Sequence, residues 1–173
     1  MNENSVRKEI VEYFNKYCSK CKGICCSKEI NAFISEISEW PQKRLFIKKN
    51  YLKRKFSKNY PIIRFSIGSE CPYIDKNRCI MKPEVRPIDC LSYPIYPIIK
   101  ITKSKTDFVG LMIHKSCPFA KKIADDKKLI NLLKTFWELL LKRIKSEEVK
   151  MWIGNKRNYW LDKNIIKVDN DKI

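Results

Sequence analysis

The sequence predicts a single small domain of the α+β class, in which helices flank a short and mainly antiparallel sheet. The chain has 173 residues, which is enough for one hydrophobic core. Helical periodicity is strongest near its two ends, and short β-prone runs separated by proline-rich loops occupy the middle. We therefore expect residues 1–173 to form one domain, with a cysteine-rich core at 18–118 and a C-terminal helical extension at 119–173.

The first element is an amphipathic helix predicted over residues 4–17. Its apolar side chains recur at helical spacing and share one side: Val6, Ile10, Val11, Phe14 and Tyr17. Glutamate and lysine occupy the opposite side, so the apolar side should pack against the core. The helix runs directly into Cys18, and Gly23 permits a tight turn a few residues later.

Two short strands are predicted next, at residues 30–34 and 60–67, because both runs are rich in residues that favour strands. The segment between them predicts a helix that begins near Pro41. Four of its side chains lie at helical spacing: Leu45, Phe46, Lys49 and Leu52.

Residues 70–97 are rich in proline and cysteine, and this composition predicts loops rather than regular helix or sheet. A turn pattern at residues 75–77 lies between Cys71 and Cys79. We expect this segment to form a knuckle that presents two sulfur atoms around a hairpin.

The C-terminal half predicts a β-hairpin followed by one long helix. Residues 95–102 and 107–113 are the expected strands, joined by a polar turn. Asp125 or Asp126 suits the N-cap of a helix that extends to about Lys145. The apolar side chains of this helix share a core face: Leu129, Leu132, Leu133, Phe136, Leu140 and Ile144. The tail should pack onto the body through its aromatic residues Trp152, Tyr159 and Trp160.

The eight cysteines are the residues of this chain that point to a chemistry. Four of them lie within nine residues: Cys18, Cys21, Cys25 and Cys26. The other four follow at Cys71, Cys79, Cys90 and Cys117. Clustered thiolates repel one another unless a metal neutralises their charge. Because the polar start of the chain does not resemble a signal peptide, we expect a cytoplasmic protein whose cysteines bind metal rather than form disulfides.

The residues leave the kind of metal open. Four thiolates hold an iron–sulfur cluster, and the surplus thiol of the adjacent pair Cys25 and Cys26 suits such a centre, which favours a [4Fe–4S] cluster. Eight sulfurs would also suit two Zn²⁺ sites of four thiolates each. His114 is the single histidine and lies three residues before Cys117. It is either a ligand or proton shuttle of the centre, or an ordinary packed side chain.

The net charge of +18 raises the question of nucleic-acid binding. Lysines are spread along the whole chain without clusters of arginine, so this class of partner is disfavoured. No apolar run is long enough for a membrane span. The four glycines form no phosphate-binding loop, and the sequence contains no hydrolase or metalloprotease motif.

The motifs follow one another in a distinctive order: Cys18-x-x-Cys21-x-Gly23-x-Cys25-Cys26, Cys71-Pro-Tyr, Cys79-Ile-Met, Arg86-Pro87-x-x-Cys90-x-x-Tyr93-Pro94 and Cys117. This order resembles the YkgJ-type cysteine-cluster family, which is also described as the CxxCxxCC zinc- or iron-chelating domain. The resemblance covers about residues 18–118. The chain has one more residue between Cys21 and Cys25 than the family name implies.

The resemblance implies a metal centre, and we expect all eight cysteines to gather around it. Flagellin lysine N-methylases are similar in this module, where the likeness implies an iron–sulfur cluster. We therefore expect a metal-binding protein, with a protein substrate or partner as a further candidate ligand. The alternatives are an iron–sulfur-dependent protein-modifying enzyme and a basic nucleic-acid-binding zinc protein. Arg86 should bind carbonyl oxygens or a carboxylate beside the centre and offset the thiolate charge.

Overall fold

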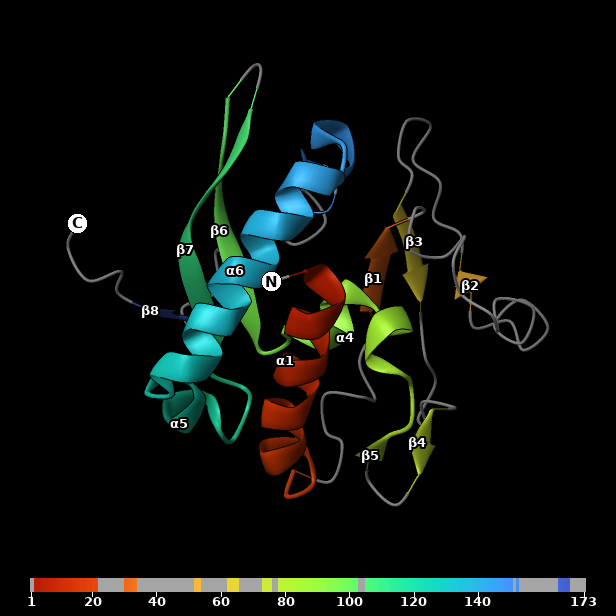
Figure 1. Ribbon diagram of the computed structural model, residues 1–173, viewed down its shortest axis with the longest axis vertical. Coiled ribbons are helices and arrows are strands. Elements are labelled where there is room, and N and C mark those ends of the chain that lie inside the picture. The colour runs from red at the N-terminus through yellow and green to blue at the C-terminus, as the bar shows by residue number, and fades with distance from the viewer. Residues whose placement is uncertain are drawn as a thin grey trace.

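The computed structural model is an α+β fold in which two long helices pack side by side and small antiparallel sheets flank them (Figure 1). The structure describes residues 2–21, 30–33, 52–53, 62–65, 73–75, 78–102, 105–150, 152 and 165–168. The helices are α1 (Glu3–Cys18), the 3₁₀-helix η2 (Pro83–Val85), α4 (Ile88–Ser92), α5 (Ala120–Ala124) and α6 (Lys127–Arg143). The strands are β1 (Ile30–Phe33), β2 (Leu52–Lys53), β3 (Ile62–Phe65), β4 (Ile74–Asp75), β5 (Arg78–Cys79), β6 (Ile95–Ile101), β7 (Thr106–His114) and β8 (Ile165–Val168).

Helix α1 confirms the amphipathic helix predicted at the start of the chain. Asn2 caps it, because its side-chain oxygen accepts a hydrogen bond from the Ser5 N–H at 2.9 Å. The apolar side is buried through Val6, Ile10, Val11 and Phe14. Arg7 is buried on the same helix, with 4% of its surface exposed.

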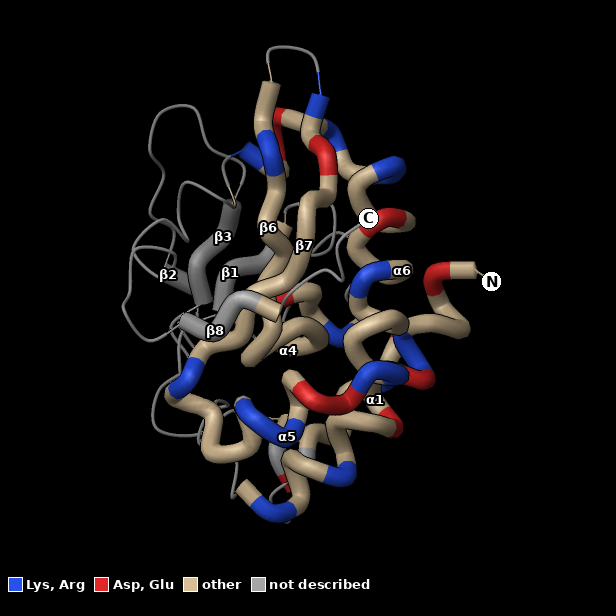
Figure 2. The backbone as a smooth tube through the Cα atoms, turned by 90° about the vertical axis from the view of Figure 1, so that its left-hand side faces the viewer, with Lys and Arg blue, Asp and Glu red and all other residues tan. Residues whose placement is uncertain are grey.

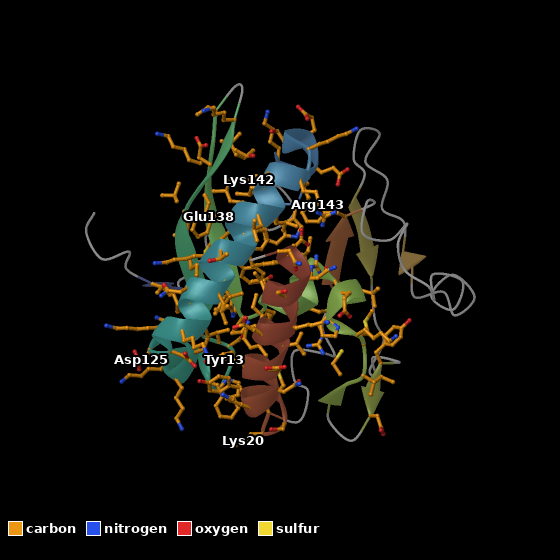
Figure 3. All side chains as sticks on the ribbon, in the orientation of Figure 1. Tyr13, Lys20, Asp125, Glu138, Lys142 and Arg143 are labelled. Carbon is orange, nitrogen blue, oxygen red and sulfur yellow. The ribbon has the colours of Figure 1, made fainter. Side chains whose placement is uncertain are left out.

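Helix α6 confirms the long C-terminal helix and its cap. The carboxylate of Asp126 accepts a hydrogen bond from the Leu129 N–H at 3.1 Å, and the expected core face is buried. The two long helices run antiparallel, since Tyr17 at the end of α1 binds Asp126 and Glu3 at the start of α1 binds Arg143. Figure 3 shows Arg143 beside the first turn of α1.

The largest sheet follows the order β6–β7–β8, with antiparallel pairing throughout. Its first two strands confirm the predicted hairpin, which pairs Ile95 with Ile113 and Ile101 with Thr106. The register shifts between Ile98 and Ile99, which marks a β-bulge. Figure 2 shows the far ends of β6 and β7 extending beyond the part of β7 that pairs with β8. A second sheet has the order β1–β3–β2, and its β1 and β3 match the two short strands expected before residue 68.

Two expectations for the middle of the chain are wrong. Leu52, which was expected on a helix face, lies in β2 and pairs with Phe65 of β3, because sheet pairing overrides a short helical periodicity. The proline-rich segment holds regular structure: Pro83 begins η2 and Pro87 caps α4. Proline fits these positions because the first turn of a helix does not use its N–H groups. The rest of the helix expected near Pro41 lies outside the described residues.

The C-terminal segment packs into the same buried cluster as α1 and the cysteine-rich part of the chain. Leu133, Phe136 and Trp152 pack in one buried cluster with Ile10 of α1. The segment also contributes the strand β8, which the sequence did not indicate. Tyr159 and Trp160 lie outside the described residues. Within the part of the chain that the structure describes, no helix is both long enough and apolar enough to cross a membrane.

Candidate functional site

Three of the predicted cysteines line one pocket at the C-terminal end of α1. Cys18 and Cys21 come from the end of the helix, and Cys117 comes from the turn between β7 and α5. Eight further residues of the described part of the chain line it: Phe14, Tyr17, Tyr93, Pro94, Ser116, Pro118, Phe119 and Ile123. The cavity volume is about 20 Å³, which is enough to admit at least one small ligand such as a water molecule.

The end of α1 builds the first side of the pocket. Cys18 is the last residue of the helix, and the N–H of Cys21 donates to the carbonyl oxygen of Cys18 at 3.2 Å. This turn keeps the two cysteines of the Cys-x-x-Cys motif at the same helix terminus. The Tyr17 ring packs against the Phe119 ring with centroids 5.8 Å apart, which ties the helix end to the opposite wall.

The turn after β7 builds the opposite side. The N–H of Cys117 donates to the carbonyl oxygen of His114 at 3.3 Å, and the N–H of Ala120 donates to the carbonyl oxygen of Cys117 at 3.0 Å. Cys117 is therefore fixed between the end of β7 and the start of α5. The N–H of His114 donates to the carbonyl oxygen of Pro94 at 2.8 Å, which holds the third wall, Tyr93 and Pro94, against this turn.

Cys79 and Cys90 lie on segments that pack along α1 but do not line this pocket. Cys79 is in β5, whose hairpin partner β4 pairs Ile74 with Cys79, so the predicted hairpin around residues 75–77 is present. Cys90 is in α4. Both segments are held to the helix because the Arg7 guanidinium donates from Nη1 to the Arg86 carbonyl oxygen at 3.1 Å.

Arg86 is almost fully buried, with 5% of its surface exposed. Its Nη2 donates to the carbonyl oxygens of Cys79 and Met81 at 3.4 and 3.5 Å. The guanidinium therefore binds carbonyl oxygens at and just after the end of β5, and this is the carbonyl-binding role that the sequence indicated. Nearby, Lys8 of α1 pairs with Glu84 of η2 at 3.4 Å. The pKa of the Glu84 carboxyl is lowered, mainly by a hydrogen bond from the Glu84 backbone N–H and also by Lys8.

Exposed lysines lie in α5 and at the start of α6: Lys121, Lys122, Lys127 and Lys128. Figure 2 shows basic positions in blue along α5. Two of the lysines on this side of the molecule face the Tyr13 ring, Lys16 at 4.4 Å and Lys128 at 5.4 Å from the centroid. The Tyr13 hydroxyl raises the pKa of the Lys128 ammonium. Burial and the adjacent Asp126 carboxylate raise the pKa of Tyr17 in the pocket wall.

Five of the eight predicted ligands can be placed, and all five are partly exposed: Cys18, Cys21, Cys79, Cys90 and Cys117. Cys25, Cys26 and Cys71 lie outside the described residues. Within the described ranges, no three or more histidine, cysteine or acidic side chains form a group that could hold a metal ion. Among the described residues, the structure thus brings three of the predicted cysteines to the lining of one pocket.

His114 is buried at the end of β7, and its Nδ1 lies 2.6 Å from the Ser116 hydroxyl. The sequence indicated His114 and Cys117, and the tyrosine of the Cys90-x-x-Tyr93-Pro94 motif was the one pattern that pointed to the wall at Tyr93. The sequence gave no reason to single out Ser116 as the partner of the histidine.

No protein-family model, curated protein or solved structure matches the chain.

Proposed function

We propose that this chain is a metal-binding protein whose centre is built at the end of α1. One observation carries the proposal: Cys18 and Cys21 line the same pocket as Cys117, about a hundred residues away in the sequence. Cysteine thiolates are ligands for zinc and for iron–sulfur clusters. Bringing Cys117 to the end of α1 closes a long loop at a cost in chain entropy, so the arrangement favours a shared role over three unrelated cysteines.

The position of the pocket favours a cation. Cys18 is the last residue of α1 and Cys21 lies in the turn that follows. The C-terminal end of a helix carries a partial negative charge, which stabilises cations and disfavours neighbouring thiolates that lack one. A metal bound there would neutralise both the thiolates and the helix end.

A complete centre needs ligands beyond the three thiols of the pocket. Structural Zn²⁺ takes four ligands, and an iron–sulfur cluster is also held by four thiolates. The other predicted cysteines are the candidates for the remaining positions: Cys25, Cys26, Cys71, Cys79 and Cys90. Zn²⁺ and the [4Fe–4S] cluster favoured by the sequence both take thiolate ligands, so analysis of the bound metal decides between them.

The proposal agrees with the resemblance to the YkgJ-type cysteine-cluster family. The family motif places Arg86 and Tyr93 on either side of Cys90, and in this chain Arg86 binds the Cys79 carbonyl while Tyr93 lines the pocket. We also propose that the protein works in the cytoplasm, because thiols stay reduced and available to metal there.

Purification without oxygen, followed by analysis of metal and acid-labile sulfide, tests the proposal. A colourless protein with bound zinc would support the single-ion centre, and a brown protein with iron and sulfide would support the cluster. The proposal would be overturned by a folded protein that holds neither metal as purified and takes up neither after incubation with Zn²⁺ or with iron and sulfide.

A further inference from the structure

A chain of three side chains runs along the wall of the cysteine pocket. The Tyr93 hydroxyl lies 2.7 Å from the Ser116 hydroxyl, and the Ser116 hydroxyl lies 2.6 Å from Nδ1 of His114. Tyr93 and Ser116 both line the pocket directly. Ser116 immediately precedes Cys117, so a contact that fixes Ser116 also fixes the turn that carries the Cys117 thiol.

The direction of the hydrogen bonds follows from the backbone. The Ser116 N–H can only donate, and it points at His114 Nδ1 at 3.2 Å, so Nδ1 accepts and the ring proton is on Nε2. The Ser116 hydroxyl then donates to the same Nδ1, which leaves its oxygen to accept from the Tyr93 hydroxyl. The Ser116 hydroxyl thus has one partner on each side, His114 and Tyr93.

These side-chain hydrogen bonds join two cysteine-bearing segments that are remote in sequence. Tyr93 is the C-cap of α4, the helix that carries Cys90, whereas Ser116 and His114 belong to the turn that carries Cys117. The backbone bond from the His114 N–H to the Pro94 carbonyl ties the strands together just before this turn. The side-chain bond between Tyr93 and Ser116 extends that tie across the turn itself.

We propose that Ser116 is a positioning residue of the metal site, which holds Cys117 in the pocket through its bonds to Tyr93 and His114. If Ser116 stabilised only its own turn, its hydrogen bonds to His114, two residues away, would be sufficient. The bond to Tyr93 spans 23 residues and fixes the turn against the pocket wall. Groups that orient ligands in this way typically change metal affinity when they are removed.

Alkylation of the metal-free protein with iodoacetamide tests the positioning directly, with each cysteine followed by peptide mass spectrometry. In the Ser116→Ala variant the turn loses two side-chain bonds, and we expect Cys117 to react about fivefold faster or more relative to Cys79 in the same molecule. Ser116→Thr keeps the hydroxyl and should stay near the wild-type ratio. An unchanged ratio in Ser116→Ala would overturn the proposal.

Two further variants keep this test decisive. Tyr93→Phe removes one hydroxyl and should raise the Cys117 ratio by a smaller factor, even if Ser116→Ala does not fold. Thr102→Ala removes a hydroxyl that hydrogen-bonds Lys105 at the far end of the hairpin, and it should leave the ratio unchanged. A Tyr93→Phe ratio equal to that of wild type would also count against the proposal.

The effect on metal affinity rests on the proposed function. With Co²⁺ as a spectroscopic probe, we expect Ser116→Ala to bind about tenfold more weakly, with altered thiolate-to-cobalt absorption, and Ser116→Thr to bind like wild type. If wild-type protein binds no Co²⁺, the proposed function fails while the alkylation result still decides the positioning role. If Ser116→Ala binds Co²⁺ as wild type does, Ser116 has no role toward the metal.

Discussion

The Tyr17 hydroxyl donates a hydrogen bond to the Asp126 carboxylate at 3.2 Å, and the other oxygen of that carboxylate caps α6 through the Leu129 N–H. One carboxylate therefore holds the start of α6 and the end of α1 together. This end of α1 carries Cys18 and forms a wall of the cysteine pocket. The contact links the stability of the helix pair to the geometry of the site.

The first prediction concerns the pH dependence of this contact. Burial and Asp126 raise the pKa of Tyr17 above its ordinary value of about 10. The neutral tyrosine is favoured in the folded state, so its stabilising effect is fully present below pH 10 and is lost as the pH rises through the folded pKa. We expect Tyr17→Phe to lower the free energy of unfolding by about 1 kcal/mol at pH 7.

The difference between wild type and Tyr17→Phe isolates this residue, because the lysines titrate equally in both proteins. Urea denaturation at several pH values should show a difference that is constant up to about pH 9 and shrinks above about pH 10. A difference that grows with pH would mean that ionised Tyr17 is favoured in the folded protein, contrary to its contact with Asp126.

The second prediction concerns Glu3, which binds Arg7 Nε at 2.8 Å and Arg143 Nε at 3.0 Å. The Arg7 side chain is buried, so replacing its carboxylate partner leaves a poorly compensated charge. Glu3→Gln should lower the free energy of unfolding by about 2 kcal/mol. Arg143 is 44% exposed, and Arg143→Gln should cost less than about 1 kcal/mol. If urea denaturation showed the same loss of unfolding free energy for Glu3→Gln and Arg143→Gln, the buried pair of Glu3 and Arg7 would add nothing to stability.

The third prediction concerns Arg86, the buried guanidinium that donates to the Cys79 and Met81 carbonyls. Arg86→Ala leaves these carbonyls without their donor, and we expect a loss of about 2 kcal/mol in unfolding free energy together with reduced bound metal. Arg86→Lys keeps the charge but not the fork, so it should recover only part of either quantity. A variant with wild-type melting temperature and metal content would remove Arg86 from the site.

Local patterns predicted the elements that depend on neighbouring residues. The sequence predicted a helix cap at Asp125 or Asp126, and Asp126 is the cap; it also predicted the hairpin around residues 103–104, because capping and β-alternation depend on consecutive residues. The burial of Arg7 was missed because its partners, Glu3 and the Arg86 carbonyl, include one that is 79 residues away. The sequence gave no sign that a charged residue would face the core.

The site was predicted as a list of cysteines, and its geometry depends on tertiary packing. The pattern predicted that all eight cysteines gather, but it did not indicate that Cys18, Cys21 and Cys117 would line one pocket, which follows from the antiparallel helices and the turn after β7. Tyr93 and Ser116 carry no metal-ligand chemistry. Their contact arises only when α4 and this turn meet in the fold, so a motif search has nothing to detect.

The last prediction ranks the cysteines by their place in the structure. If the centre is built on the pocket, Cys18→Ser, Cys21→Ser and Cys117→Ser should each weaken metal binding by at least about tenfold, because serine is a poor substitute for a thiolate. Cys79→Ser is the comparison variant: Cys79 is also partly exposed but does not line the pocket, so it should matter less unless it supplies one of the remaining ligands. Competition with a chelator, followed by metal analysis, measures the four affinities.

The comparison variant also decides how many segments share the centre. Cys79 lies in β5, whereas Cys117 lies in the turn between β7 and α5. A small effect of Cys79→Ser would confine the centre to the pocket at the end of α1. A loss equal to that of Cys117→Ser would contradict the pocket-based ranking, because it would require the Cys79 thiol and the pocket thiols to bind one larger centre, as a [4Fe–4S] cluster with its spread of iron atoms would.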